Sequence, residues 1–238
     1  MSMLTVNGWN SIPGLVHGFL SRLPTAATVD STSPDWSTQL EAHGVPRLTV
    51  VMARQVHGTR ICNAASLPAS PPEADGLVTT TRGLVVGIKT ADCVPVLFVA
   101  PPALFAAAVH AGWRGAVAGI VPEAVSTAVS NAAVTTAELR VAIGPAVGPC
   151  CYEVGPEVRV AFEKRYGSGW TAPVFNTTPG PRPHLDLRLF VRRQLEAAGV
   201  SPSAIEIVGP CTACDRTYAS YRRDGQGADR QLSFVGWL

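Results

Sequence analysis

The chain has 238 residues, of which 47% are hydrophobic and 15% are charged, and its formal net charge at pH 7 is +2. This length and composition are typical of a globular protein with a large core, and we expect residues 1–238 to form a single domain or two closely merged halves. The sequence has no run of lysine or arginine. A nucleic-acid surface is therefore not expected, because binding to phosphates needs clustered basic charge.

The N-terminus lacks the basic and apolar segments of a secretory signal, so we expect a cytoplasmic protein. Residues 90–113 are apolar over a length that could span a bilayer, but Asp92, His110 and three prolines lie within them, which argues against a membrane span. The six cysteines are too few for a disulfide scaffold at this length. We expect a monomer.

The first predicted elements are a short strand within residues 12–22, where His17 is expected to be structural, and buried strands at residues 48–53 and 84–88. Asp75-Gly76 is a common turn dipeptide, and a turn is the favoured interpretation. The alternative is that the Asp75 carboxylate orients a metal-binding histidine.

Two further apolar runs, residues 94–100 and 104–109, are separated by Pro101-Pro102 and predict a hairpin. A hairpin brings its open ends together, so Cys93, just before the first strand, should face His110, just after the second. Asp92 should point to the opposite face of an extended chain and is expected to accept structural hydrogen bonds.

His57 lies after the strand at residues 48–53 and completes a His57/Cys93/His110 set. Zinc binds imidazole nitrogen and thiolate sulfur, and catalytic zinc sites commonly use three protein ligands with the fourth position open. The three residues follow no fixed metal-binding spacing. An inert buried cysteine with two structural histidines is therefore the open alternative.

The remaining elements form the predicted scaffold. A helix at residues 117–131 should begin near His110, where its N-terminus and Arg114 could bind an anion, unless the neighbouring glycines serve close packing. Asp186 is the expected N-cap of another helix, at residues 187–198. The other expected elements are strands at residues 139–143, 205–208 and 230–235 and a helix at residues 157–165.

The other cysteines are expected to have little chemistry. Cys150 and Cys151 are adjacent and would form only a strained disulfide, so packing is the favoured role. Cys211 and Cys214 form a Cys-x-x-Cys motif, but no second such pair is present to complete a zinc site.

These segments together resemble the YfiH family, which is also called the laccase-domain or polyphenol oxidase family. The resemblance covers nearly the whole chain. It rests on these motifs: His17-Gly-Phe, Gln55-Val-His-Gly58, Ala74-Asp-Gly-Leu-Val-Thr79, Thr90-Ala-Asp-Cys-Val-Pro95, Val109-His-Ala-Gly-Trp-Arg-Gly115, Ile143-Gly-Pro, Cys151-Tyr-Glu-Val-Gly155, Cys211-Thr and Ser220-Tyr-Arg-Arg-Asp224.

The resemblance implies an α+β fold, a four-layer α/β/β/α sandwich with mixed β-sheets that some cysteine hydrolases share. It also implies a Zn²⁺ site at His57, Cys93 and His110, which would be the catalytic residues, and phosphorolysis of purine nucleosides by inorganic phosphate with accompanying adenosine deaminase activity. Bacterial members are linked to peptidoglycan editing. We expect the substrate to contact these motif residues: Gln55, Arg114, Tyr152, Arg222 and Arg223.

The proton donor to the purine is open between Asp75, Tyr152 and Glu153. Three other functions remain: a metal-free hydrolase with Cys93 as nucleophile and a histidine as base, a copper oxidase, and a binding module without catalysis. The copper oxidase is disfavoured, because a multicopper site needs many histidines and this chain has five, none of them in a His-x-His pair.

Overall fold

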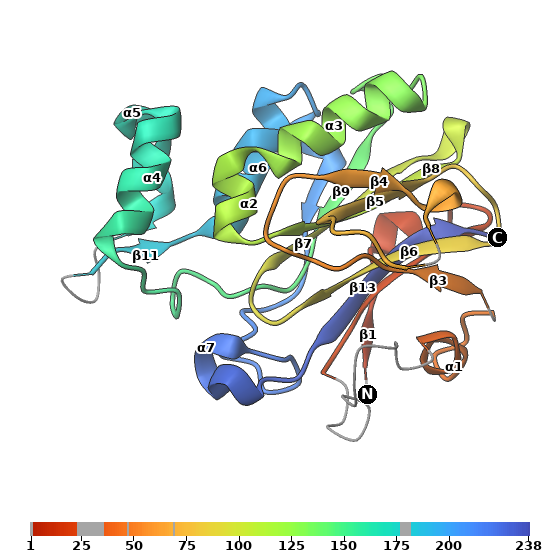
Figure 1. Ribbon diagram of the computed structural model, residues 1–238, viewed down its shortest axis with the longest axis horizontal. Coiled ribbons are helices and arrows are strands. Elements are labelled where there is room, and N and C mark those ends of the chain that lie inside the picture. Colours follow the sequence, from red (N-terminus) through yellow and green to blue (C-terminus); the bar gives the residue numbers. More distant parts are fainter. Residues whose placement is uncertain (1, 23–35, 47, 69, 177–181) are drawn as a thin grey trace.

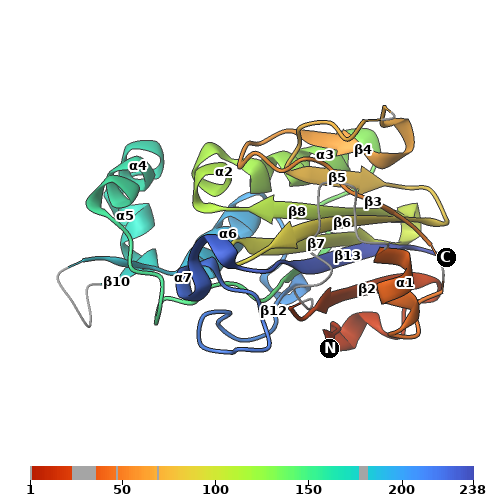
Figure 2. The same cartoon turned by 60° about the horizontal axis from the view of Figure 1, so that its bottom comes forward.

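The computed structural model of the protein, shown in Figure 1, describes residues 2–22, 36–46, 48–68, 70–176 and 182–238. Two mixed β-sheets pack face to face, and helices lie on their outer sides (Figures 1 and 2). This arrangement is the α+β fold of α/β/β/α layers that the family resemblance implies.

The first sheet has the strand order β1-β2-β13-β6-β3 in the described part of the chain. Its strands are β1 (Met3–Leu4), β2 (Leu15–Leu20), β13 (Gln231–Trp237), β6 (Leu84–Thr90) and β3 (Thr49–Val51). Strand β13 pairs antiparallel with both β2 and β6, whereas β3 runs parallel to β6. The centre of this sheet is therefore formed by the strand that comes last in the sequence.

The second sheet has the order β12-β9-β7-β8-β5-β4 among the described residues. Its strands are β12 (Ile205–Ile207), β9 (Arg140–Ile143), β7 (Val94–Ala100), β8 (Phe105–Ala111), β5 (Gly76–Thr79) and β4 (Ile61–Asn63). A separate short pair consists of β10 (Phe175–Asn176) and β11 (His184–Leu185). Because β12 and β9 are parallel, the loops that follow them leave the sheet at the same edge.

Helices α2, α3 and α6 cover the outer face of the second sheet, while α1 lies beside the first (Figure 1). The helices are α1 (Trp36–Glu41), α2 (Trp113–Ala118), α3 (Ile120–Asn131), α4 (Pro156–Tyr166), α5 (Ser168–Thr171), α6 (Leu187–Ala197) and α7 (Tyr221–Asp224). No helix among the described residues is long and apolar enough to cross a membrane.

Strand β7 shows why these residues form a buried sheet. All seven of its residues are buried, and they alternate between two cores because successive side chains of a strand point to opposite faces. Val96 and Phe98 pack in the core beneath the helices, whereas Leu97 and Val99 pack in the core between the two sheets. A strand buried on both faces reads as a continuous apolar run.

The predicted hairpin is confirmed, since β7 and β8 pair antiparallel and a 3₁₀ turn at Pro101–Ala103 joins them. The predicted N-cap is also confirmed, because the Asp186 side chain accepts a hydrogen bond from the backbone N–H of Leu189 at 2.9 Å. The helix expected at residues 117–131 is instead two helices, because Gly119 has a φ of 103°, which ends α2 and begins α3.

Candidate metal centre and active site

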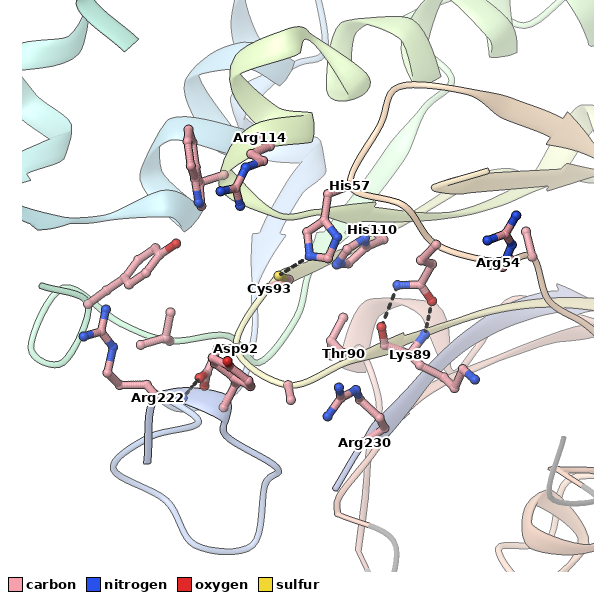
Figure 3. Close-up of a pocket in the computed structure, with 17 residues that line it drawn as sticks. Arg54, His57, Lys89, Thr90, Asp92, Cys93, His110, Arg114, Arg222 and Arg230 are labelled. Carbon is pink, nitrogen blue, oxygen red and sulfur yellow. Dashed lines mark hydrogen bonds between the residues drawn. The ribbon is translucent and has the colours of Figure 1, made fainter. Parts of the chain in front are cut away.

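A cavity of about 850 Å³ opens where the loops after β3 and β6 meet the end of β8. This volume lies within the range of ligand-binding clefts. Figure 3 shows His57, Cys93 and His110 gathered on one wall of the cavity, with basic side chains around them. The lining residues are Ala53, Arg54, Gln55, His57, Lys89, Thr90, Ala91, Asp92, Cys93, His110, Trp113, Arg114, Val147, Tyr152, Tyr221, Arg222 and Arg230.

The hairpin brings Cys93 and His110 together as expected. Pro95 is paired with His110 across β7 and β8, so Cys93 lies just beyond the open end. The Sγ atom of Cys93 is 3.9 Å from Nε2 of His57, and the rings of His57 and His110 meet edge to face with their centroids 4.8 Å apart. The ligand atoms of the three residues all lie within 4.8 Å of one another.

Asp75 holds this group in place, so the interpretation of Asp75-Gly76 as a simple turn is wrong. The carboxylate is fully buried and accepts a hydrogen bond from Nδ1 of His110 at 2.8 Å. It also accepts from the backbone N–H groups of Val56, His57 and Gly58 at 3.1, 2.9 and 2.7 Å. One side chain thus orients the His110 ring and anchors the loop that carries His57.

The anchored loop has an unusual backbone at His57, whose φ of 60° lies in the left-handed region. A non-glycine residue in this region is uncommon, and such strain persists when surrounding contacts impose it. The three hydrogen bonds to Asp75 supply those contacts. They keep the imidazole of His57 over Cys93, as Figure 3 shows.

The electrostatics of the group favour a thiolate. Burial opposes the charge on Cys93, but hydrogen bonds from His110 and His57 outweigh it and lower the thiol pKa to about 6. Burial likewise opposes the charge on His110, but its hydrogen bonds with Asp75 and Cys93 raise the pKa to about 9. A deprotonated sulfur facing two imidazoles is a strong ligand set for a soft or borderline metal.

The donor set and its spacing fit a zinc ion. Tetrahedral zinc, with bonds of about 2.0–2.3 Å to nitrogen and sulfur, separates its ligand atoms by roughly 3.3–3.8 Å. The Cys93–His57 separation of 3.9 Å needs little adjustment to meet this requirement. Because Nδ1 of His110 is bonded to Asp75, its Nε2 is left for the metal, which is the usual arrangement of a metal-ligating histidine.

The glycines after His110 serve close packing. A Cβ atom on Gly112 would lie 2.8 Å from Cδ2 of His57 and 3.1 Å from Sγ of Cys93, and one on Gly115 would lie 2.8 Å from the carbonyl oxygen of Gly58. These approaches bring α2 against the His57 loop. Helix α2 has six residues, and Gly112 supplies no side-chain cap.

Of the predicted substrate-binding residues, Gln55, Arg114, Tyr152 and Arg222 line the cavity. The guanidinium of Arg114 stacks over the Trp113 ring at 4.4 Å, and that of Arg222 lies 5.7 Å from the centre of the Tyr152 ring. Lys89 and Arg230 also line the cavity, although no local sequence pattern predicts it, and they come together because β6 and β13 are neighbours. Burial and the nearby charge of Arg230 lower the pKa of Lys89.

Gln55 and Arg223 also hold the chain around the cavity in place. The Gln55 amide bonds to the backbone of Lys89 in both directions, at 2.7 and 2.8 Å, so it fixes the strand beside the cavity. Arg223 does not line the cavity. Its guanidinium pairs with Asp224 and donates to the carbonyl of Thr212 at 3.0 Å.

The structural role predicted for Asp92 is confirmed, although Asp92 also lines the cavity. Its carboxylate accepts hydrogen bonds from the hydroxyls of Thr212 and Ser220, at 2.6 and 3.1 Å, and from the backbone N–H of Arg222 at 2.5 Å. The residue next to Cys93 therefore ties the β7 end to the loop that carries Arg222.

Comparison with known proteins places these features in a family. Residues 32–238 match the model of a family described as multi-copper polyphenol oxidoreductase laccase. A purine nucleoside phosphorylase, YlmD of Geobacillus stearothermophilus, is 37% identical over 196 residues, which are 78% of this chain and 71% of that protein. An adenosine deaminase, RL5, from an unknown prokaryotic organism is 36% identical over 202 residues, covering 81% of this chain and 76% of the relative.

The fold is shared as well. The crystal structure of the YfiH protein of Bacillus licheniformis superimposes with a TM-score of 0.84 at 25% identity and covers 100% of this chain and 97% of that one. The sequence motifs, the sheet arrangement and the family match agree, and the chain belongs to the laccase-like YfiH family.

Proposed function

We propose that this chain is a zinc-dependent purine nucleoside phosphorylase that acts as one catalytic domain. It converts adenosine, inosine or methylthioadenosine, together with phosphate, into the free base and a pentose-1-phosphate. It also has adenosine deaminase activity. The observation that carries the proposal is the His57/Cys93/His110 group on the wall of a cavity of about 850 Å³ rimmed by cationic side chains. The names of YlmD and RL5 support the two activities.

Zinc at this group would position the attacking phosphate oxygen in phosphorolysis and would lower the pKa of the attacking water in deamination. The chain itself provides the ligands His57, Cys93 and His110, and Asp75 keeps the His110 ring in the required orientation. Holding both reactants in line is the other part of the rate enhancement.

The basic residues around the cavity suit the binding of a phosphate ion. Arg114 and Arg222 lie on one side, and Lys89 and Arg230 lie on the other (Figure 3). Arginine and lysine both bind phosphate oxygens, and a cavity lined by one sign of charge raises the local concentration of an anionic substrate.

Among the three candidate proton donors, Tyr152 lines the cavity, whereas Asp75 and Glu153 do not. Asp75 is occupied by His110 and the His57 loop, and Glu153 pairs with Arg182. Burial raises the pKa of Tyr152, so its phenol keeps its proton at neutral pH. We assign to it a hydrogen bond to the purine.

The test is to incubate zinc-quantified protein with adenosine, with and without phosphate, and to follow adenine, ribose-1-phosphate and inosine by chromatography. We expect adenine and ribose-1-phosphate to appear only with phosphate, and inosine to form without it. The Cys93→Ala variant should lose both reactions together with the zinc bound at the His57/Cys93/His110 group.

Cys62→Ala is the matched control, because that thiol packs against the core between the sheets and does not line the cavity. It should keep both activities. A protein with full zinc content that turns over none of the three nucleosides would overturn the proposal.

A Cys-His hydrolase is the second candidate, favoured by the lowered pKa of Cys93 and by the hydrogen bond between His110 and Asp75. The order Cys93, His110, Asp75 has the residue types of a nucleophile, a base and an orienting acid. Zinc would occupy the thiolate. Amidase activity on a muropeptide that persists in the chelated protein would favour this candidate, and activity that needs zinc would exclude it.

A multicopper oxidase is not favoured, although the family description mentions copper. The candidate centre combines two histidines with one cysteine, and the chain has five histidines in all. Multicopper chemistry needs a larger imidazole set.

A further inference from the structure

The structure gathers four cysteines at a second place, in the loops that follow β9 and β12. The first loop carries Cys150 and Cys151, and the second carries Cys211 and Cys214. Since β9 and β12 are parallel neighbours, both loops leave the sheet at the same edge. They continue side by side, because Ala146 and Cys211 form a parallel bridge and the Thr212 N–H donates to the Ala146 carbonyl at 3.1 Å.

All four sulfur atoms lie within 4.8 Å of one another. Sγ of Cys214 is 3.4 Å from Sγ of Cys151 and 3.6 Å from that of Cys150. A disulfide bond is about 2.05 Å long, so these distances are those of separate thiols. Tetrahedral zinc with four bonds of about 2.3 Å to sulfur sets its sulfurs roughly 3.8 Å apart, which is close to the observed spacing.

The surroundings of the sulfurs are those of a metal-binding loop. The backbone N–H of Gly148 donates to Sγ of Cys211 at 3.1 Å, and the Cys211–Cys214 segment turns back on itself with the Asp215 N–H bonded to the Cys211 carbonyl at 3.0 Å. A Cβ on Gly148 would lie 3.3 Å from Sγ of Cys150, so a glycine lets this backbone approach the cluster. Hydrogen bonds that fix the ligands are a regular part of metal sites.

A cation also accompanies the cluster. Arg223 donates to the carbonyls of Thr212 and Ala213, the two residues between Cys211 and Cys214. Four thiolates around a divalent ion carry a net charge of −2, which the Arg223 guanidinium, itself paired with Asp224, offsets in part. Cys150 and Cys214 are exposed, so an ion can reach the site from solvent.

We propose that Cys150, Cys151, Cys211 and Cys214 bind a structural Zn²⁺ ion that joins the two loops. Four cysteine sulfurs leave no position for water or substrate, which distinguishes this closed site from the three-ligand group at Cys93. The adjacent pair Cys150-Cys151 takes the place of the second Cys-x-x-Cys motif that the sequence lacks.

The position of the site connects the bound ion to the wall of the cavity. Tyr152, beside Cys151, lines the cavity, and Thr212, beside Cys211, bonds to Asp92 next to Cys93. Joining the two loops therefore fixes one wall of the cavity. This inference does not depend on which reaction the cavity carries out.

The test is the zinc-to-protein ratio, measured by elemental analysis of full-length protein purified under reducing conditions with zinc supplied. We expect two zinc ions per chain in the parent protein, one in Cys93→Ala, one in Cys214→Ala and none in the double variant. Cys62→Ala, which removes a thiol from neither group, should keep two. X-ray absorption at the zinc edge of Cys93→Ala should show sulfur ligands alone.

If a variant does not fold, the number of zinc ions per chain in the parent protein still tests the proposal. One zinc per chain in the parent, lost in Cys93→Ala and kept in Cys214→Ala, would overturn the proposal. A disulfide involving Cys150, Cys151 or Cys214 in the reduced, zinc-supplied protein would overturn it too, as would iron bound there in place of zinc.

Discussion

Asp75→Asn tests the claim that one buried carboxylate organises the candidate active site. Oδ1 accepts from His110 and from the His57 N–H, and Oδ2 accepts from the N–H groups of Val56 and Gly58. Asparagine keeps the shape but replaces one oxygen with an NH₂ group, which donates. Whichever way the amide turns, two of the four donors lose their acceptor.

Each hydrogen bond to a charged group contributes about 1.5–3 kcal/mol, so losing two should lower the free energy of unfolding by about 3–6 kcal/mol. The orientation of His110 is also weakened, and loss of such a partner typically reduces metal affinity about 10- to 100-fold. Urea unfolding measures the first quantity, and competition for zinc with a chromophoric chelator measures the second.

Asp224→Asn is the matched control, because Asp224 is exposed and its carboxylate pairs with the adjacent Arg223. A pair of this kind contributes at most about 1 kcal/mol, and zinc affinity at Cys93 should not change. If Asp75→Asn has the same free energy of unfolding and the same zinc affinity as the parent protein, the carboxylate neither anchors the loop nor orients the histidine.

Three other predictions concern single side chains. Burial opposes the Cys93 thiolate, but hydrogen bonds from the two histidines lower the thiol pKa to about 6. The rate at which iodoacetamide alkylates Cys93 in zinc-free protein should therefore rise with pH, with a midpoint near pH 6. A midpoint near pH 9 would contradict this. Gly112→Ala should reduce zinc affinity, because its Cβ would lie 2.8 Å from Cδ2 of His57. Gly169→Ala, with open space around the added Cβ, should leave the affinity unchanged. Equal zinc affinities of the two variants in a zinc titration would refute the steric argument. Burial lowers the pKa of His17 from 6.5 to about 4, so the unfolded chain binds the extra proton first and stability should fall by about 3 kcal/mol as pH drops from 6.5 to 4. Unfolding at both pH values should show a smaller loss in His17→Gln, and an equal loss would place the pH dependence elsewhere.

The parts of the site that depend on neighbouring strands could be predicted from the sequence. Pro101-Pro102 between two apolar runs indicates a hairpin, and a hairpin places Cys93 beside His110 whatever the rest of the fold. Likewise, Asp186 before an amphipathic segment indicates a helix start, and the structure has that cap. In these cases the residues in contact are close to one another along the chain.

The missed features depend on contacts between distant segments. Lys89 and Arg230 meet because β6 pairs with β13, and no local pattern indicates that pairing. For Asp75 the sequence leaves two interpretations open, a turn and a carboxylate that orients a histidine, and only the folding of the His57 loop over it decides between them. The cysteine cluster needs the parallel pairing of β9 with β12, so the sequence alone shows two unrelated cysteine pairs.

The place of β13 in the first sheet affects how the protein is made. The ribosome synthesises β2 and β6 well before residues 231–237, yet β13 lies between them. The nascent chain can form the β7–β8 hairpin early, whereas β2 and β6 each keep an unpaired edge that invites aggregation until β13 emerges. Arg230 enters the cavity together with β13, so a chain still attached to the ribosome before this point has an incomplete site. The cavity wall is therefore completed only when residues 231–237 have left the ribosome and joined the first sheet.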